Sequence, residues 1–252
     1  MWGPPVIVAV VFGLVIGSFL NVVIARIPAR KSLWKPGSSC PGCDAAIAWH
    51  DNVPLLSFAA LRGKCRRCGI SIPWRYPIVE ATTGALFGIA YWQFGPTPDF
   101  VSATLFLSML VAITGIDFRH QIIPDVISLP GIVAGFLANL ATGRVPWMDS
   151  AIGIIVGGGT FLVIILASGG GMGGGDMKLG AMLGAFLGWK VVLLTMFIAV
   201  VLGGALAVAL IASGLRGRKD PIPFGPFLAA GGAVGLLWGE RMVRWYLDVF
   251  AA

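Results

Sequence analysis

The stretch VVLLTMFIAVVLGGALAVALIAS, from Val191 to Ser213, contains no charged residue. At about 1.5 Å per residue, a helix of this length crosses the roughly 30 Å hydrocarbon core of a bilayer. The whole chain has the same character, because 57% of its 252 residues are hydrophobic and 12% are charged, whereas about 25% of the residues of a soluble domain are charged. The sequence therefore predicts a membrane protein and excludes a soluble enzyme.

Seven further apolar runs predict an all-α polytopic membrane protein with about eight transmembrane helices. The run that begins the chain resembles a signal peptide but lacks a basic n-region and a small-residue cleavage site, so we expect a retained first span. Many of the 36 glycines lie inside apolar runs, which favours close helix packing. The expected helices are Pro5–Ile27, Ile78–Phe94, Phe100–Ile116, Ile122–Ala141, Ala151–Ala167, Met177–Gly188, Val191–Ser213 and Phe227–Leu247.

Basic residues indicate the orientation in the membrane. The segment from Arg26 to Arg75 holds nine Lys or Arg against two acids, so the positive-inside rule predicts that it is cytoplasmic. Alternation of the spans then gives an N-out, C-out topology with 14 of the 18 basic residues in the cytoplasm. Because topology explains the net charge of +7, nucleic-acid binding is not expected. The five further basic residues on the cytoplasmic side are Arg119, Lys178, Arg216, Arg218 and Lys219.

This topology predicts three parts of the chain. Residues 1–27 form the first transmembrane helix, residues 28–76 a small cytoplasmic cysteine-bearing loop, and residues 77–252 the transmembrane core.

All four cysteines lie in the cytoplasmic loop, as Cys40-Pro-Gly-Cys43 and Cys65-Arg-Arg-Cys68. Two CxxC pairs can supply four thiolates to one tetrahedral zinc ion, in a zinc-ribbon-like arrangement that leaves no open position for water. Two disulfides or four idle thiols are the alternatives, although a reducing compartment disfavours disulfides. We expect a structural zinc site, with His50 as a surface residue rather than a ligand.

Two acidic segments, both on the predicted cytoplasmic side, are candidates for chemistry, because ionisable residues at membrane depth are costly and commonly functional. Gly115 to Asp125 contains Asp117 and Asp125, and Gly171 to Lys178 has glycines before Asp176. Two neighbouring carboxylates cannot both ionise readily, so one can activate water while the other donates a proton. Glycines would also let an extended substrate strand approach the acid.

Each acid also has a structural alternative. Asp117 could be a solvated acid paired with Arg119 or Arg75, and Asp176 could only cap its helix after a flexible glycine loop. Asp125 follows Pro124 and suits a helix start, so it could cap, orient the acidic pair or bind substrate charge. Two other functions stay open: an ion transporter using intramembrane acids, and a scaffold that docks a partner through its zinc ribbon.

The motifs, in this order along the chain, resemble the type IV prepilin leader peptidase family, whose members are GxGD intramembrane aspartyl proteases. They cover nearly the whole chain. They are GSFLNVV from Gly17, the paired CxxC loop, NVPLLS from Asn52, RYPIVE from Arg75, Asp117 with Ile123-Pro124-Asp125, the GxGD element Gly173–Asp176 with Lys178, and PFGP from Pro223.

The resemblance implies that Asp117 and Asp176 are the catalytic aspartates of an enzyme in the bacterial inner membrane. It implies cleavage of the basic leader of type IV prepilins or type II secretion pseudopilins, at the cytoplasmic face and just before their apolar helix. It also implies, for many members, N-methylation of the new terminus with S-adenosylmethionine. No residues for that cofactor are apparent in the sequence, and this loop is shorter than in the longer members.

Overall fold

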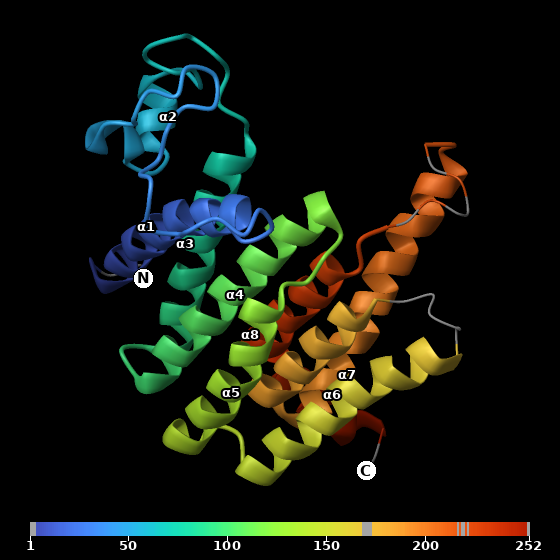
Figure 1. Cartoon of the computed structure of the whole chain (residues 1–252). Helices are drawn as coiled ribbons and strands as arrows, with labels where there is room; N and C mark the ends of the chain where they lie inside the picture. Colours follow the sequence, from blue (N-terminus) through green and yellow to red (C-terminus); the bar gives the residue numbers. More distant parts are fainter. Residues whose placement is uncertain (1–3, 168–172, 216, 218–219, 221, 251–252) are drawn as a thin grey trace. The chain divides into compact units, whose positions relative to one another are not determined.

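The computed structural model describes residues 4–167, 173–215, 217, 220 and 222–250. Five residues discussed above lie outside this part of the chain: Gly171, Met172, Arg216, Arg218 and Lys219. The regular elements of the described residues are helices (Figure 1), which confirms the all-α prediction. They are α1 (Pro4–Arg26), a 3-10 helix η1 (Trp49–Asn52), α2 (Leu56–Ala60), α3 (Arg75–Phe94), α4 (Pro98–His120), α5 (Asp125–Thr142), α6 (Trp147–Ala167), α7 (Gly174–Ala212) and α8 (Gly225–Phe250).

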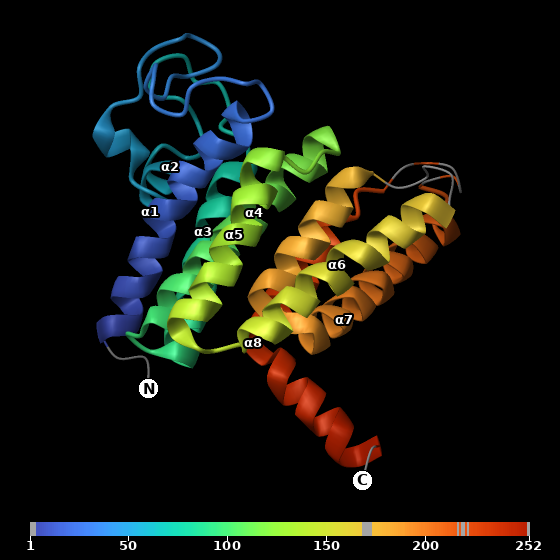
Figure 2. The same ribbon diagram turned by 60° about the horizontal axis from the view of Figure 1, so that its bottom comes forward.

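The chain forms two compact units, Met1–Phe100 and Val101–Ala252. In the first unit, α1 and α3 lie side by side (Figure 2) because glycines remove side-chain bulk between them. A Cβ on Gly17 would lie 2.7 Å from the Cα of Glu80. The buried Asn21 adds a polar link by donating to the Tyr76 carbonyl at 3.1 Å. Small residues and buried amides are typical of packed membrane helices.

The loop between α1 and α3 contains η1, α2 and two short antiparallel bridges, Ser39 with Ala46 and Lys64 with Ser71. Both bridges enclose a CxxC pair, so the two halves of the loop have the same local shape. The division of the chain at residues 27 and 76 stays a prediction.

The second unit is a bundle of α5–α8 with most of α4, in which α7 contacts α5, α6 and α8. Glycines again set the closest contact, between α6 and α7: a Cβ on Gly157 or Gly153 would collide with the backbone of Gly180 or Gly184. The four-residue spacing on both helices places these glycines on facing stripes. The close packing predicted from the glycine content is confirmed here.

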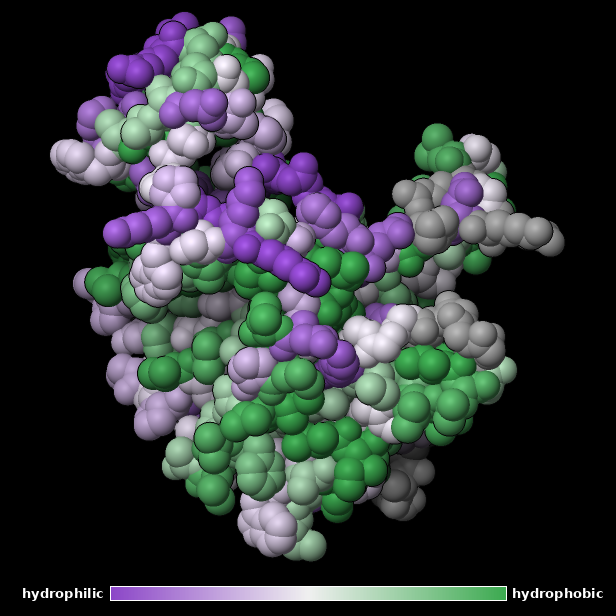
Figure 3. All heavy atoms as spheres, viewed as in Figure 1, coloured by the Kyte–Doolittle hydropathy of each residue, from purple (hydrophilic) through white to green (hydrophobic). Residues whose placement is uncertain are grey.

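Within the described residues, five helices are long and apolar enough to cross a membrane, namely α1, α4, α5, α6 and α7. Large hydrophobic side chains cover the visible face of α5 and α6 (Figure 3), and Val133 on α5 and Ile155 on α6 are 59% and 72% exposed. Outward-facing apolar side chains suit a lipid solvent. The protein is therefore an integral membrane protein.

The structure differs from the prediction at the helix boundaries. The two helices expected on either side of Gly188 are present within one element, α7 (Gly174–Ala212), which breaks at Gly188 as predicted, and the short loop expected after Gly188 is a kink. Gly188 has φ 75° and ψ 169°, a conformation that favours glycine. Helix α4 extends to His120, so Asp117 lies within its last turn, and α5 begins at Asp125 rather than at Ile122.

Candidate active site and cysteine cluster

Asp117 is buried at the C-terminal end of α4, where its side chain is held by a backbone donor. The residue is 5% exposed, and its Oδ2 accepts a hydrogen bond from the amide of Gly225 at 3.0 Å. The alternative of a solvated acid paired with Arg119 is therefore wrong. A buried carboxylate needs such a partner, because an unpaired polar group away from water costs free energy.

Gly225 has this role because it begins α8, where the first amides lack partners within the helix. The absence of a side chain is also required, since a Cβ on Gly225 would lie 2.6 Å from Oδ2 of Asp117. The PFGP motif thus places a free donor against the carboxylate and leaves room for it.

Asp176 lies in the first turn of α7 and is half-buried. Gly173 occupies the N-cap position, with extended φ −76° and ψ 144°, and its carbonyl accepts the Asp176 amide at 3.2 Å. The alternative that Asp176 is the helix cap is therefore wrong. A Cβ on Gly175 would lie 2.9 Å from the Cβ of Ile123, so the fold brings the start of α7 against the chain that follows Asp117, although the two acids are 59 positions apart in the sequence, 176 minus 117.

Asp125 and Lys178 form an ion pair next to this acidic pair, with the ammonium of Lys178 2.6 Å from Oδ1 of Asp125. The N-cap of α5 is Pro124, so Asp125 is the first helical residue rather than the cap. The sequence contained both residues in recognisable motifs but gave no signal that they pair.

The four cysteine sulfurs form a compact cluster. The Sγ atoms of Cys40, Cys43, Cys65 and Cys68 all lie within 4.8 Å of one another, and those of Cys40 and Cys68 are 3.7 Å apart. A tetrahedral ion with Zn–S bonds of about 2.3 Å requires sulfurs about 3.8 Å apart. The donor set and its spacing therefore fit a four-cysteine metal site, and all four cysteines are free thiols rather than disulfides.

The two CxxC pairs have the same backbone geometry. The carbonyl of Cys40 accepts the amide of Asp44, and the carbonyl of Cys65 accepts that of Gly69. Asp44 and Gly69 both have positive φ, 51° and 72°. The pKa of the Cys65 thiol is lowered to about 6 by hydrogen bonds from the amides of Cys68 and then Arg67, whereas burial and the neighbouring thiols raise the pKa of the Cys68 thiol to about 11.

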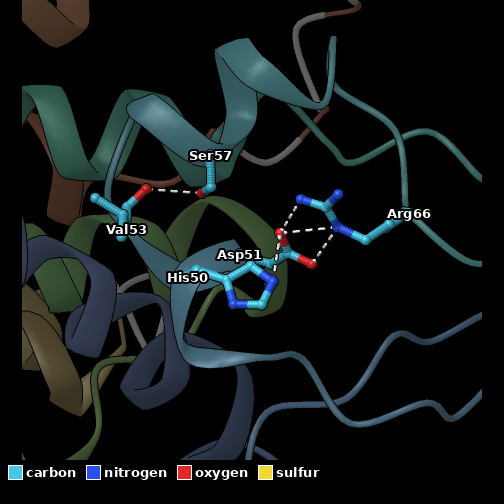
Figure 4. Close-up of polar contacts among 5 residues, drawn as sticks. All are labelled: His50, Asp51, Val53, Ser57 and Arg66. Atoms are coloured by element: carbon cyan, nitrogen blue, oxygen red, sulfur yellow. Dashed lines mark hydrogen bonds and ion pairs between the residues drawn. The ribbon is translucent and has the colours of Figure 1, made fainter.

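An ion pair links η1 to the second CxxC pair (Figure 4). The Arg66 guanidinium makes hydrogen bonds of 2.6, 2.9 and 3.1 Å to the carboxylate of Asp51. These bonds, more than the charge of Arg66, hold the pKa of Asp51 below its ordinary value. His50 lies 3.8 Å from Asp51 with a 53% exposed side chain, as expected of a surface residue.

Comparison with known proteins identifies two regions. Residues 11–94 match the Bacterial Peptidase A24 N-terminal domain, and residues 104–208 match the Type IV leader peptidase family. No solved structure matches the chain.

Curated relatives cover almost the whole chain. A prepilin leader peptidase/N-methyltransferase of Aeromonas salmonicida is 37% identical over 267 residues, which cover 94% of this chain and 92% of the relative. Proteins of the same name from Stutzerimonas stutzeri and Pseudomonas aeruginosa are 38% and 37% identical over 271 residues. These cover 96% of this chain and 94% and 93% of the relatives. With this identity over nearly its whole length, the chain belongs to the type IV leader peptidase family.

Proposed function

We propose that the protein is a membrane aspartyl endopeptidase that removes the basic leader from type IV prepilins or type II secretion pseudopilins, with Asp117 and Asp176 as its catalytic pair. One observation carries the residue assignment: Asp117 is buried and hydrogen-bonded by Gly225, and the chain that follows it packs at Ile123 against Gly175, the residue before Asp176. The substrate class rests on the relatives, which are named prepilin leader peptidases.

The proposed chemistry is hydrolysis by a carboxyl pair that shares one proton. The ionised carboxylate removes a proton from water, whose oxygen attacks the scissile carbonyl, while the protonated carboxyl donates to the carbonyl oxygen. Collapse of the tetrahedral intermediate breaks the C–N bond: the leaving amine takes the proton that the first carboxylate removed from water, and the hydroxyl formed from the carbonyl oxygen returns its proton to the other carboxylate. The hydrogen bond from Gly225 keeps one oxygen of Asp117 fixed throughout, so only the other oxygen has to serve the reaction.

The glycines before Asp176 support access of an extended peptide to the pair. Gly173 and Gly174 are exposed, and the side of Gly174 that would carry a Cβ has no atom within 4 Å. A substrate strand can approach the backbone closely at such a position. An apolar substrate helix could remain in the lipid while its unwound N-terminal end reaches Asp176.

The proposed topology has about eight spans, with α7 contributing two because it breaks at Gly188. The cysteine loop and both aspartates would face the cytoplasm of a bacterial inner membrane, as the basic residues of the loop favour. Single-cysteine labelling in a variant without Cys40, Cys43, Cys65 and Cys68 tests this. A thiol at Ser39 should react with a membrane-impermeant reagent only after the cytoplasmic side is opened.

The cysteine cluster would hold one structural zinc ion through Cys40, Cys43, Cys65 and Cys68. The ion would join the two CxxC pairs and stabilise a loop that has little apolar core, because just one of its residues, Cys40, is buried. Four sulfur ligands complete its coordination, so no catalytic step passes through it.

A second activity, N-methylation of the new N-terminus by S-adenosylmethionine, is supported by the relatives' names. The methyl group would move from the donor's sulfonium to the free amine exposed by cleavage. We assign no residues of this chain to the donor.

One assay tests both activities. The detergent-purified protein is incubated with a prepilin, with and without S-adenosylmethionine, and the product mass is measured. We expect loss of the leader under both conditions and one additional methyl group only with the donor. An unprocessed prepilin would contradict the proposed peptidase, and a cleaved but unmethylated product would contradict the second activity alone.

A further inference from the structure

The ion pair between Asp125 and Lys178 joins the two chain segments that carry the proposed catalytic acids. Lys178 lies two residues after Asp176 on α7, and Asp125 lies eight residues after Asp117, at the start of α5. The connection between Asp117 and Asp125 is short and turns sharply. The amide of Gln121, which has φ 51°, donates to the Asp117 carbonyl at 3.0 Å.

A second contact lies beside the ion pair. A Cβ on Gly175 would lie 2.9 Å from the Cβ of Ile123, so the backbone at the start of α7 packs directly against the chain that enters α5. Asp176 is therefore flanked by two contacts with the same segment, one from Gly175 and one from Lys178. Further along, the buried Asn139 donates to the Ala185 carbonyl at 2.8 Å, which fixes the register of α5 against α7.

We infer that Asp125 and Lys178 are positioning residues, whose ion pair holds the first turn of α7 so that the carboxyl of Asp176 faces Asp117. The inference rests on the proposed function and adds a role for two residues outside the carboxyl pair. A displacement of about 1 Å in a catalytic group can cost about a hundredfold in rate. The first turn of α7 requires a contact that holds it in place, because the helix begins with Gly174 and Gly175 and glycine has a low helix propensity.

Because the ion pair is accessible to solvent, a role in positioning Asp176 can be distinguished from a role in stabilising the fold. The side chains of Lys178 and Asp125 are 30% and 55% exposed, and ion pairs this accessible contribute little to the free energy of unfolding. The competing role for Asp125 is direct attraction of the basic substrate leader. However, its Oδ1 is already held by Lys178 at 2.6 Å.

The test measures kcat and KM for prepilin cleavage by the full-length protein in detergent. The variants are Asp125→Asn, Lys178→Met, both together, the exchanged pair D125K/K178D, and the conservative Lys178→Arg. Glu240→Gln is the matched control, because Glu240 forms an exposed ion pair with Arg244 on α8. Each variant is also assayed on a prepilin whose leader lysines and arginines are replaced by glutamine.

We expect each single neutral variant to lower kcat by about tenfold with KM within about twofold. The double variant should be no slower than either single variant, because each single substitution already breaks the ion pair between Asp125 and Lys178. Lys178→Arg should keep most of the rate, the exchanged pair should recover part of it, and Glu240→Gln should match the wild type. The ratio of variant to wild-type kcat should be equal on both substrates.

Two results would overturn the inference. One is wild-type kinetics in both single variants. The other is a raised KM for Asp125→Asn that disappears with the neutral leader, which would make Asp125 a substrate contact. Should Asp125→Asn fail to fold, the Lys178 variants, which retain the acid at the start of α5, still test the inference, because wild-type kcat in Lys178→Met would overturn it. A wild-type protein that cleaves no prepilin would contradict the proposed function instead.

Discussion

The amide of Gly225 donates a hydrogen bond of 3.0 Å to the buried carboxylate of Asp117, although the two residues are 108 positions apart in the sequence. The bond ties the start of α8 to the end of α4. It gives the PFGP motif a direct connection to the proposed chemistry.

Replacing Gly225 with alanine should disable cleavage without unfolding the protein. The new Cβ would lie 2.6 Å from Oδ2 of Asp117, so the carboxylate must move. We expect kcat to fall by about a hundredfold, because the displaced carboxylate is one of the two proposed catalytic groups. Prepilin cleavage and the midpoint of thermal unfolding in detergent are the measurements.

Gly159→Ala is the control for this variant, because a Cβ on Gly159 of α6 would have no neighbour within 4 Å. It should retain wild-type cleavage. Equal rates for the two alanine variants would show that the contact between Gly225 and Asp117 is not needed.

Removal of one cysteine should remove the metal. Cys65→Ser leaves three sulfur ligands, and metal affinity depends on the full set of thiolates. Elemental analysis should show about one zinc per chain in the wild type and almost none in the variant. His50→Ala should retain the zinc, since His50 lies outside the cluster of sulfurs. Zinc retained in Cys65→Ser, or lost in His50→Ala, would contradict the four-cysteine site.

The ion pair between Asp51 and Arg66 should protect the loop from proteolysis. Asp51→Asn removes the negative charge and one of the two oxygens that accept hydrogen bonds from Arg66, so we expect faster cleavage by trypsin between residues 27 and 74. Asp44→Asn is the matched control, because Asp44 is the other acid of this loop and asparagine tolerates its positive φ of 51°.

The pH dependence of this protection follows from the pKa of Asp51, which Arg66 lowers. The pKa of Asp51 is lower in the folded protein than in the unfolded chain, where it is about 3.9. The stabilisation by the ion pair is therefore complete at pH values above about 3.9. It is lost only as the pH falls through the still lower folded value. The difference in trypsin cleavage rate between wild type and Asp51→Asn should thus not shrink between about pH 8 and about pH 5. A difference that shrinks over this interval would contradict the assignment.

The stability of the contact between α6 and α7 should depend on the glycines of α7 that face α6, and not on other glycines of the same helix. A Cβ on Gly184 would collide with the backbone of Gly153, whereas a Cβ on Gly204 of the same helix would meet no atom within 4 Å. We expect Gly184→Ala to lower the free energy of unfolding by about 1–3 kcal/mol through overpacking. Gly204→Ala should leave it nearly unchanged. Denaturation in detergent measures both, and equal stability of the two variants would argue against the glycine contact.

The sequence predicted the helices well because lipid requires long apolar runs and backbone groups that are satisfied within each helix. It also located the break at Gly188, although the short loop expected after this residue is a kink between two equally apolar helices. The boundary near Asp117 was misplaced. Asp117 is polar and lies near the end of its run, yet it is buried inside α4 by its contact with α8.

The sequence also indicated candidate site residues, but not their partners. Glycines, acids and CxxC pairs are local sequence patterns, so the residues next to Asp176 and Cys65 in the sequence were enough to make them candidates. The bonds from Gly225 to Asp117 and from Lys178 to Asp125 join distant segments, and helix packing creates them. No local pattern reports such a contact.

The central claim is that Asp117 and Asp176 perform the cleavage, and the most direct measurement is prepilin processing by the purified Asp117→Asn and Asp176→Asn variants. Asparagine keeps the shape of each side chain and removes its ability to ionise. We predict that both variants fold, bind zinc like the wild type, and release no leader. Full leader release by either folded variant would contradict the account.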